Sequence, residues 1–174
     1  GNLISIDEKG DIYAVGTFSG TIQFETQSMT AASVENTDNF LVKYAADGSM
    51  AWARSLKGSK LDDINAMDVA NHQVVIGGVI RSEDLAVDNA PFSSGTWNSM
   101  LIISFDTDGN YQWNYIAGSS NQPTDVKTIA IEKDGSIWNA GTTFGTYYFN
   151  PDAEDEAKQF PSKAKGGQDM YLMK

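Results

Sequence analysis

The amino-acid sequence predicts an all-β protein, a partial β-propeller of about three four-stranded antiparallel blades with the last blade incomplete. Three observations predict this fold. One unit of about 60 residues recurs nearly three times along the 174-residue chain. Short apolar runs alternate with Asp-Gly and similar turn signals. Finally, the three-to-four-residue spacing of an amphipathic helix is not sustained anywhere.

The first unit is expected to contain four strands in two hairpins: Leu3–Ile6 with Asp11–Phe18, and Asn39–Ala45 with Met50–Leu56. Asp47-Gly48 lies between the two strands of the second hairpin. Asp-Gly between apolar runs is a strong hairpin signal, because glycine adopts a positive φ without a Cβ clash.

The second unit repeats these landmarks 61 positions later. Gly16 matches Gly77, Asp47-Gly48 matches Asp108-Gly109, and Trp52 matches Trp113. The spacing therefore predicts a corresponding hairpin from Met100–Phe105 and Tyr111–Ile116.

The third unit repeats the first at an offset of 125 positions, which carries Gly16 onto Gly141. Asp38–Lys43 then recurs as Asp169–Lys174 at an offset of 131, so six residues are inserted between Phe149 and Asp169. The units are assigned to 3–62, 63–124 and 125–174 of a single propeller segment, 1–174.

Several strands are apolar at successive positions: Phe40-Leu41-Val42, Val74-Val75-Ile76 and Leu101-Ile102-Ile103. Successive side chains of a strand point to opposite faces, so both faces of these strands must be covered. Sheets that stack between two neighbours meet this requirement, which favours a propeller over a sandwich with one wet face.

The repeat resembles the SBBP-type repeat of bacterial β-propeller proteins. The matching pieces are Ile12–Gly16, Asp38–Lys43, and Asp47-Gly48 with Trp52. The second unit departs from the pattern in three ways: a first hairpin shortened around Asn71-His72, and Ser99 and Ser104 in place of the Asp and Lys. The resemblance implies an extracellular or cell-envelope location, often without an assigned activity.

Three units are fewer than the four to eight blades of a closed propeller, and the third unit stops before its Trp hairpin. We therefore expect the remaining blades of a longer chain, or a second copy, to complete the ring. An open arc leaves an apolar face at each end, so the isolated chain is not expected to be a well-behaved monomer.

Composition excludes several function classes. With 23 acidic and 12 basic residues the net charge is −11, which argues against a nucleic-acid partner. Cysteine is absent, His72 is the only histidine and is expected in a turn, and no phosphate-binding loop occurs. Asp106–Asn110 is interpreted as a hairpin turn rather than a calcium loop. No metal, cofactor or membrane span is expected.

Charged pairs do not single out a catalytic residue, and none is assigned. Carboxylates such as Asp62-Asp63 are too abundant for sequence spacing to select a glycosidase pair. Asp38 and Lys43 recur together as Asp169 and Lys174, which indicates a structural ion pair.

The strongest functional signal is length variation between the second and third strands of each unit, in Ser19–Asp38, Ile80–Asn98 and Phe144–Gln168. Loops on a rigid scaffold are common binding sites. The candidate binding residues in these loops are Trp97, Tyr147, Tyr148, Asp152, Glu154 and Asp155. An alternative is that Tyr147 and Tyr148 only pack a strand.

The sequence thus predicts a non-enzymatic binding or scaffold module of a secreted or cell-surface bacterial protein, with a protein or glycan ligand. The alternative is part of a propeller enzyme, a hydrolase or lyase acting on polysaccharide.

Overall fold

A computed structural model gives the fold of the chain. It describes residues 2–33, 35–91, 98–118, 123–148 and 161–174, and only the backbone of 145–148 and 161–166. Every regular element in these ranges is a β-strand, so the all-β prediction is confirmed. No helix in the described ranges is long and apolar enough to cross a membrane.

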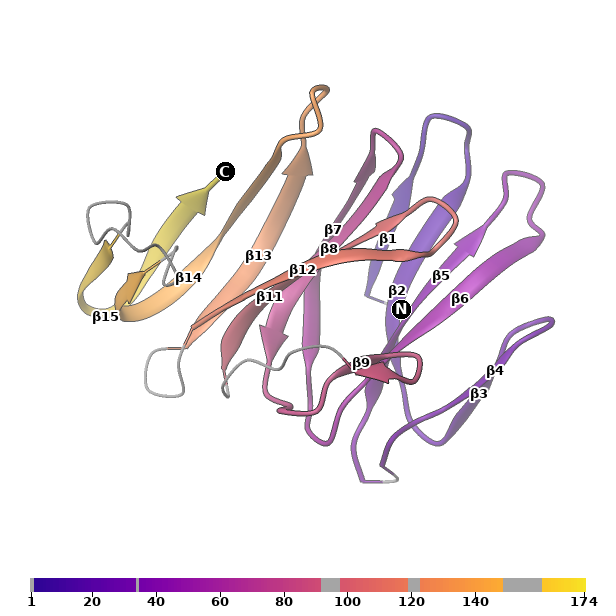
Figure 1. Cartoon of the computed structure of the whole chain (residues 1–174), viewed down its shortest axis with the longest axis horizontal. Helices are drawn as coiled ribbons and strands as arrows, with labels where there is room; N and C mark the ends of the chain where they lie inside the picture. Colours follow the sequence, from indigo (N-terminus) through magenta and orange to yellow (C-terminus); the bar gives the residue numbers. More distant parts are fainter. Residues whose placement is uncertain (1, 34, 92–97, 119–122, 149–160) are drawn as a thin grey trace.

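The strands form three main antiparallel sheets, each made of strands that follow one another along the chain (Figure 1). The first sheet contains β1 (Leu3–Ile6), β2 (Ile12–Phe18), β5 (Asp38–Tyr44) and β6 (Met50–Lys57). The second contains β7 (Asp63–Ala70), β8 (Gln73–Ile80), β11 (Ser99–Asp106) and β12 (Tyr111–Ala117). The third contains β13 (Thr124–Ile131), β14 (Ile137–Tyr148) and β15 (Pro161–Met173).

Two short hairpins interrupt the meanders between the second and third strands of a unit. In the first unit, β3 (Thr21–Gln23) and β4 (Ser28–Thr30) form a separate two-stranded sheet. In the second unit, β9 (Ala86–Val87) instead pairs with β6, and β10 (Ala90–Pro91) pairs with β9, so the hairpin extends the edge of the first sheet. The loop of one unit therefore binds the sheet of the unit before it.

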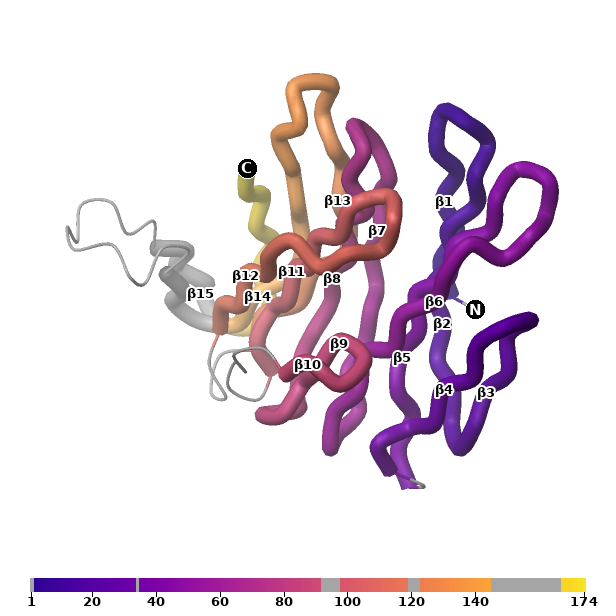
Figure 2. The backbone as a smooth tube through the Cα atoms, turned by 45° about the vertical axis from the view of Figure 1, so that its right-hand side comes forward, coloured from indigo at the N-terminus to yellow at the C-terminus, as the bar shows by residue number. Residues whose placement is uncertain are grey.

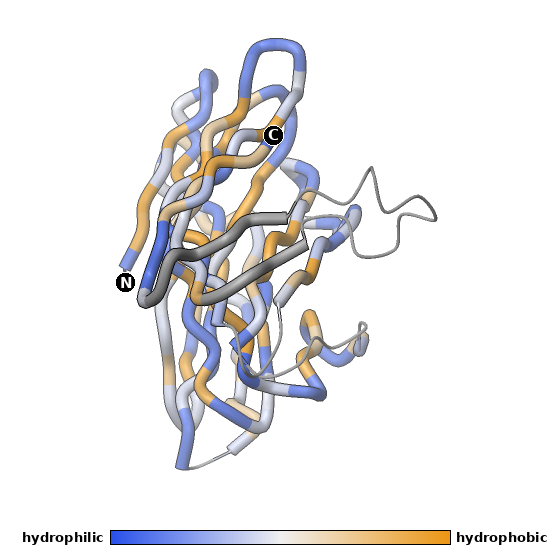
Figure 3. Tube along the Cα trace, turned by 90° about the vertical axis from the view of Figure 1, so that its left-hand side faces the viewer, coloured by the Kyte–Doolittle hydropathy of each residue, from blue (hydrophilic) through white to orange (hydrophobic). Residues whose placement is uncertain are grey.

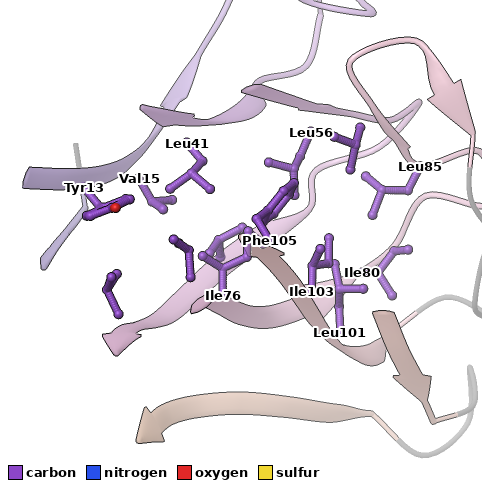
Figure 4. Close-up of a cluster of buried hydrophobic side chains, with 14 of the residues drawn as sticks. Tyr13, Val15, Leu41, Leu56, Ile76, Ile80, Leu85, Leu101, Ile103 and Phe105 are labelled. Atoms are coloured by element: carbon purple, nitrogen blue, oxygen red, sulfur yellow. The ribbon is translucent and has the colours of Figure 1, made fainter. Parts of the chain in front are cut away.

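The three sheets lie side by side with their faces in contact (Figure 2). Side chains of the first sheet, including Tyr13 and Leu41, meet Ile76, Ile103 and Phe105 of the second sheet in one buried cluster (Figure 4). A second buried cluster joins the second sheet to the third. This packing explains the successive apolar positions in the sequence, because β8 and β11 are covered on both faces.

The outer face of the first sheet is covered in part by its own β3–β4 hairpin. Met29 of β4 is buried in a third cluster with Phe18, Phe40 and Val42. The hairpin loop at the top of Figure 3 is hydrophilic, whereas apolar segments recur along the strands below it.

Glycine and asparagine residues close the hairpins as the turn signals predict. Gly48 and Gly109 have φ angles of +88° and +79°, which L-residues with a Cβ rarely adopt. The shortened hairpin of the second unit turns at Asn71 and His72, with φ angles of 49° and 61°. His72 is therefore a turn residue, as predicted.

One feature of the sequence repeat is corrected by the strand register. Gly16 pairs with Phe40, and the corresponding Leu101 pairs with Gly78, not Gly77. The connection from the glycine to the third strand is one residue shorter in the second unit, 23 positions from Gly78 to Leu101 against 24 from Gly16 to Phe40, and β7 carries a β-bulge between Ile64 and Ala66 beside Gly78. The offset of 61 is thus correct for β11 and β12, whereas β8 is offset by 62.

Gly141 confirms this correction, because it repeats the environment of Gly78. A Cβ on Gly78 would lie 1.8 Å from the carbonyl oxygen of Asp63, and a Cβ on Gly141 would lie 1.8 Å from that of Asp125. A β-bulge in β13 lies beside Gly141 as well.

Candidate functional site

A groove of about 590 Å³ opens where the first sheet, the β9–β10 loop and the second sheet meet. One wall is the loop that sequence length variation singled out between the second and third strands of the second unit. The other wall is the β11–β12 turn. The described lining residues are Arg54, Val87, Asp88, Asn89, Ala90, Pro91, Gly109, Asn110 and Tyr111.

Arg54 of β6 lines the groove and bridges two sheets. Its Nε donates a hydrogen bond of 2.7 Å to the carbonyl oxygen of Gly109 in the second sheet. Its guanidinium carbon lies 5.6 Å from the centroid of the Trp52 ring, a cation–π distance. These contacts restrict the rotamers of Arg54 before any ligand arrives.

Asp88 attaches the β9–β10 loop to the first sheet. Its backbone nitrogen donates to the carbonyl oxygen of Ser55 at 2.7 Å, and its Oδ1 accepts from the Ser55 nitrogen at 3.0 Å. Its Oδ2 lies 3.8 Å from Arg54 Nε. Asp88 has a φ of +54°, a conformation that asparagine and aspartate tolerate better than most residues. The loop wall is thereby fixed against β6.

Asp106 organises the opposite wall. Its Oδ1 accepts from the backbone nitrogens of Asp108 at 3.0 Å and Asn110 at 2.8 Å, and its Oδ2 accepts from the side chains of Asn110 and Gln112. Partial burial opposes ionisation, but these bonds prevail and the pKa of Asp106 lies below its ordinary value. The Asp106 carboxylate thus stabilises the β11–β12 turn. Among the described residues no group of acidic side chains could hold a metal ion.

Tyr111 and Asn89 are the groups that the groove presents to solvent. Tyr111 is 43% exposed as a residue, its ring packs edge-on against Phe105 at 6.5 Å between centroids, and its hydroxyl donates to Asn114 Oδ1 at 2.9 Å. Asn89 is exposed at the tip of the β9–β10 hairpin. An aromatic face surrounded by amide, guanidinium and carboxylate groups can stack on a ligand and hydrogen-bond its edges.

A smaller cavity of about 120 Å³ lies among the hairpin turns of the first two units. It is lined by the turns of the first two units, including Asp7, Lys9, Asn71, His72 and Thr107. Its size suits a few water molecules rather than an organic ligand.

The binding residues predicted from the sequence stay a prediction, because their side chains lie outside the described part of the chain. Trp97, Asp152, Glu154 and Asp155 lie outside the described residues. Tyr147 and Tyr148 lie in β14, where their backbones pair with Ser162 and Pro161, and their side chains are likewise outside the description.

The predicted ion pair between Asp38 and Lys43 is wrong. Asp38 accepts hydrogen bonds from the backbone nitrogens of Ala32 at 2.6 Å and Gly58 at 3.1 Å. Lys43 instead forms an ion pair of 2.8 Å with Asp11. The two residues lie at opposite ends of β5, so each finds a partner in its own neighbourhood.

Asp62 and Asp63 have structural partners too. Asp62 Oδ1 accepts from the backbone nitrogens of Arg81 at 2.6 Å and Ser82 at 2.9 Å, and Asp63 forms an ion pair of 2.7 Å with Arg81. Burial raises the pKa of Asp62 despite these hydrogen bonds. Both aspartates hold the start of the β9–β10 loop.

Sequence reasoning identified one wall of the groove and missed the rest. The loop 80–98 was singled out by its length, but Arg54 and Tyr111 carry no motif, and they meet only because the first two sheets stack. Tyr115 stands in the second unit where Arg54 stands in the first. Comparing equivalent positions of the repeat therefore did not mark Arg54 as a residue of the groove.

No known protein-family model matches the chain, and no curated protein sequence matches it either. The groove and the packing of the sheets are thus the basis on which function is inferred.

Proposed function

We propose that the chain is an arc of an SBBP-type β-propeller and acts as a non-enzymatic binding or scaffold module of an exported or cell-surface protein. Its ligand contacts the groove between the β9–β10 loop and the β11–β12 turn. One observation carries this proposal: Arg54 and Asp88 are fixed by intramolecular bonds beside the exposed faces of Tyr111 and Asn89. Such preorganisation lowers the entropic cost of binding.

The propeller part of the proposal is supported by the way the sheets meet. Consecutive antiparallel meanders stack face to face, and the loop of the second unit pairs with the last strand of the first sheet. Trp52 and Gly109, two landmarks of the repeat, contact each other across this boundary. The exported location rests on the resemblance of the repeat.

A glycan fits the chemistry of the groove best. Sugar rings present C–H faces that stack on aromatic side chains and hydroxyls that bond planar polar groups. Tyr111 supplies the ring, and Asn89, Arg54 and Asp88 supply the planar groups. Hydrolysis would need a second carboxylate, and Asp88 is the only acid among the described lining residues, so binding is favoured over the enzyme alternative.

Screening the purified chain on a glycan array, followed by calorimetric titration of the best oligosaccharide, tests this function. Tyr111→Ala is expected to weaken binding at least tenfold, because it removes the stacking surface. Phe144→Ala is the matched control, since Phe144 is similarly exposed at 40% but lies in the third sheet. Equal losses in both variants, with unchanged thermal unfolding, would refute the groove as the site.

A further inference from the structure

The contacts between neighbouring sheets use the same positions of the repeat each time. We call the face of a sheet that is turned toward the next sheet along the chain its forward face, and the opposite face its rear face. Leu41 and Ile102 occupy one forward-face position, because each pairs with the residue just before the glycine that recurs in every unit, Gly16 or Gly78. Both side chains are buried, at 0% and 3% exposure.

The rear faces also use one position. Met67 of β7 packs against the cluster that holds Leu41, and Ile129 of β13 lies in the cluster that holds Ile102. Met67 pairs with Ile76 and Ile129 pairs with Asn139, each two residues before the glycine of its unit. The boundary between the first and second sheets thus contains Leu41 and Met67. The boundary between the second and third sheets contains their equivalents Ile102 and Ile129.

A third set of the same positions lies exposed at the two ends of the stack. Leu172 pairs with Ala140, which makes it the forward-face equivalent of Leu41, yet it is 69% exposed. Ile4 pairs with Ala14, which makes it the rear-face equivalent of Met67, and it is 71% exposed.

Neighbouring residues enlarge both patches. Met170 lies two residues from Leu172 on the same side of β15, and Ile6 lies two residues from Ile4 on the same side of β1; both are exposed. Tyr171, between Met170 and Leu172, is buried against the second sheet, so the exposed pair faces away from the stack. The strands that carry the two patches lie at opposite ends of the stack in Figure 2.

We propose that a second copy of the chain covers these patches, with the Leu172 face of one copy against the Ile4 face of the other. The proposed contact repeats, between molecules, the packing inside the molecule, where Leu41 and Met67 share one apolar cluster and Ile102 and Ile129 share another. This association does not depend on the ligand of the groove.

Such a contact is heterologous, because the two surfaces differ. Head-to-tail contacts generate a ring where the rotation closes and an open filament where it does not. The net charge of −11 on each copy opposes association, so the contact is expected to tighten as salt screens the repulsion.

Sedimentation velocity of four purified chains tests the proposal: the wild type, Leu172→Lys, Ile4→Lys and the control Leu61→Lys. Leu61 is 49% exposed but lies between the first two sheets in sequence, outside both patches. The wild type and Leu61→Lys are expected to associate, more strongly in 0.5 M than in about 0.05 M salt. Leu172→Lys and Ile4→Lys are each expected to associate at least tenfold more weakly.

Mixing the Leu172→Lys and Ile4→Lys chains shows whether the contact is head-to-tail. The mixture retains one intact Ile4 face and one intact Leu172 face, so it is expected to form a heterodimer and no larger species. Self-association of Ile4→Lys alone would instead indicate an isologous contact between two Leu172 faces. A wild type that remains monomeric at high concentration, or a mixture that does not associate, overturns the proposal; circular dichroism of each variant verifies that it is folded.

Discussion

The indole ring of Trp52 in the first sheet lies directly against the Cα of Gly109 in the second. A Cβ placed on Gly109 would come within 2.7 Å of the ring. The Trp52 Nε1 donates to the carbonyl oxygen of Thr107 at 3.1 Å, and Lys43 Nζ donates to the same oxygen at 3.1 Å. The Trp and Asp-Gly landmarks of the repeat therefore join one sheet to the next.

Gly109→Ala is expected to destabilise the protein by about 2–5 kcal/mol. The left-handed φ costs about 1–2 kcal/mol for a residue with a Cβ, and the clash with Trp52 adds about 1–3 kcal/mol. Gly48→Ala is the matched control, because Gly48 has a similar φ but no atom within 4 Å of a built Cβ. Urea denaturation measures the free energy of unfolding of both variants. Equal losses for the two variants would mean that the Trp52 contact contributes nothing.

Gly78→Ala is expected to be more damaging than Gly77→Ala. At Gly78 the new Cβ meets the backbone carbonyl of Asp63, which cannot move without breaking the ladder beside the bulge. At Gly77 its nearest neighbour is the Cδ1 of Ile129, at 2.8 Å, which is the end of a flexible side chain. We expect a loss above about 3 kcal/mol for Gly78→Ala and about 1–3 kcal/mol for Gly77→Ala.

Soluble yield and urea midpoints of the two glycine variants compare these costs. A Gly77→Ala chain that is less stable than Gly78→Ala would contradict the register in which Gly78 corresponds to Gly16 and Gly141.

Much of the sheet architecture could be predicted because its signals are local. Turn glycines such as Gly48 and Gly109 have few alternatives, and alternating or continuous burial follows from the period of a strand. The strand Leu3–Ile6 was predicted to the residue, and β5 shifted by one. The second unit has two adjacent glycines, Gly77 and Gly78, and a connection to β11 that is one residue shorter than in the first unit, so the landmark was matched to Gly77 instead of Gly78.

The groove could not be predicted because its residues come from separate units. Lys43, Trp52 and Arg54 all reach partners more than 50 residues away along the chain. Ser104 shows the limit of repeat equivalence: it replaces Lys43 in the second unit, and its buried hydroxyl has no hydrogen-bond partner among the described residues. Contacts of this kind depend on how two sheets stack, which periodicity alone does not specify.

The Asp11–Lys43 ion pair predicts how stability changes with pH. The hydrogen bond from Lys43 holds the pKa of Asp11 below its ordinary value, although partial burial acts in the opposite direction. Burial lowers the pKa of Lys43, but the hydrogen bonds to Asp11 and Tyr13 outweigh it and leave that pKa raised.

The two pKa shifts affect the stability of the folded chain at opposite ends of the pH scale. Since Asp11 has a lower pKa in the folded state, its contribution is present above about pH 4 and is lost as pH falls through the folded value. Since Lys43 has a raised pKa, its contribution is present below about pH 10 and is lost as pH rises through the folded value.

Asp11→Asn is therefore expected to destabilise the chain across about pH 5–10, relative to the wild type, and the difference should shrink below about pH 4 and above about pH 10. Urea denaturation of both chains from pH 3 to 11 measures this. Asp47→Asn is the control: Ser49 bonds lower the pKa of Asp47, so its difference should shrink in acid, but without a lysine partner it should not shrink in alkali. An Asp11→Asn difference that persists unchanged at pH 11 would show that the charge of Lys43 contributes nothing to the pair.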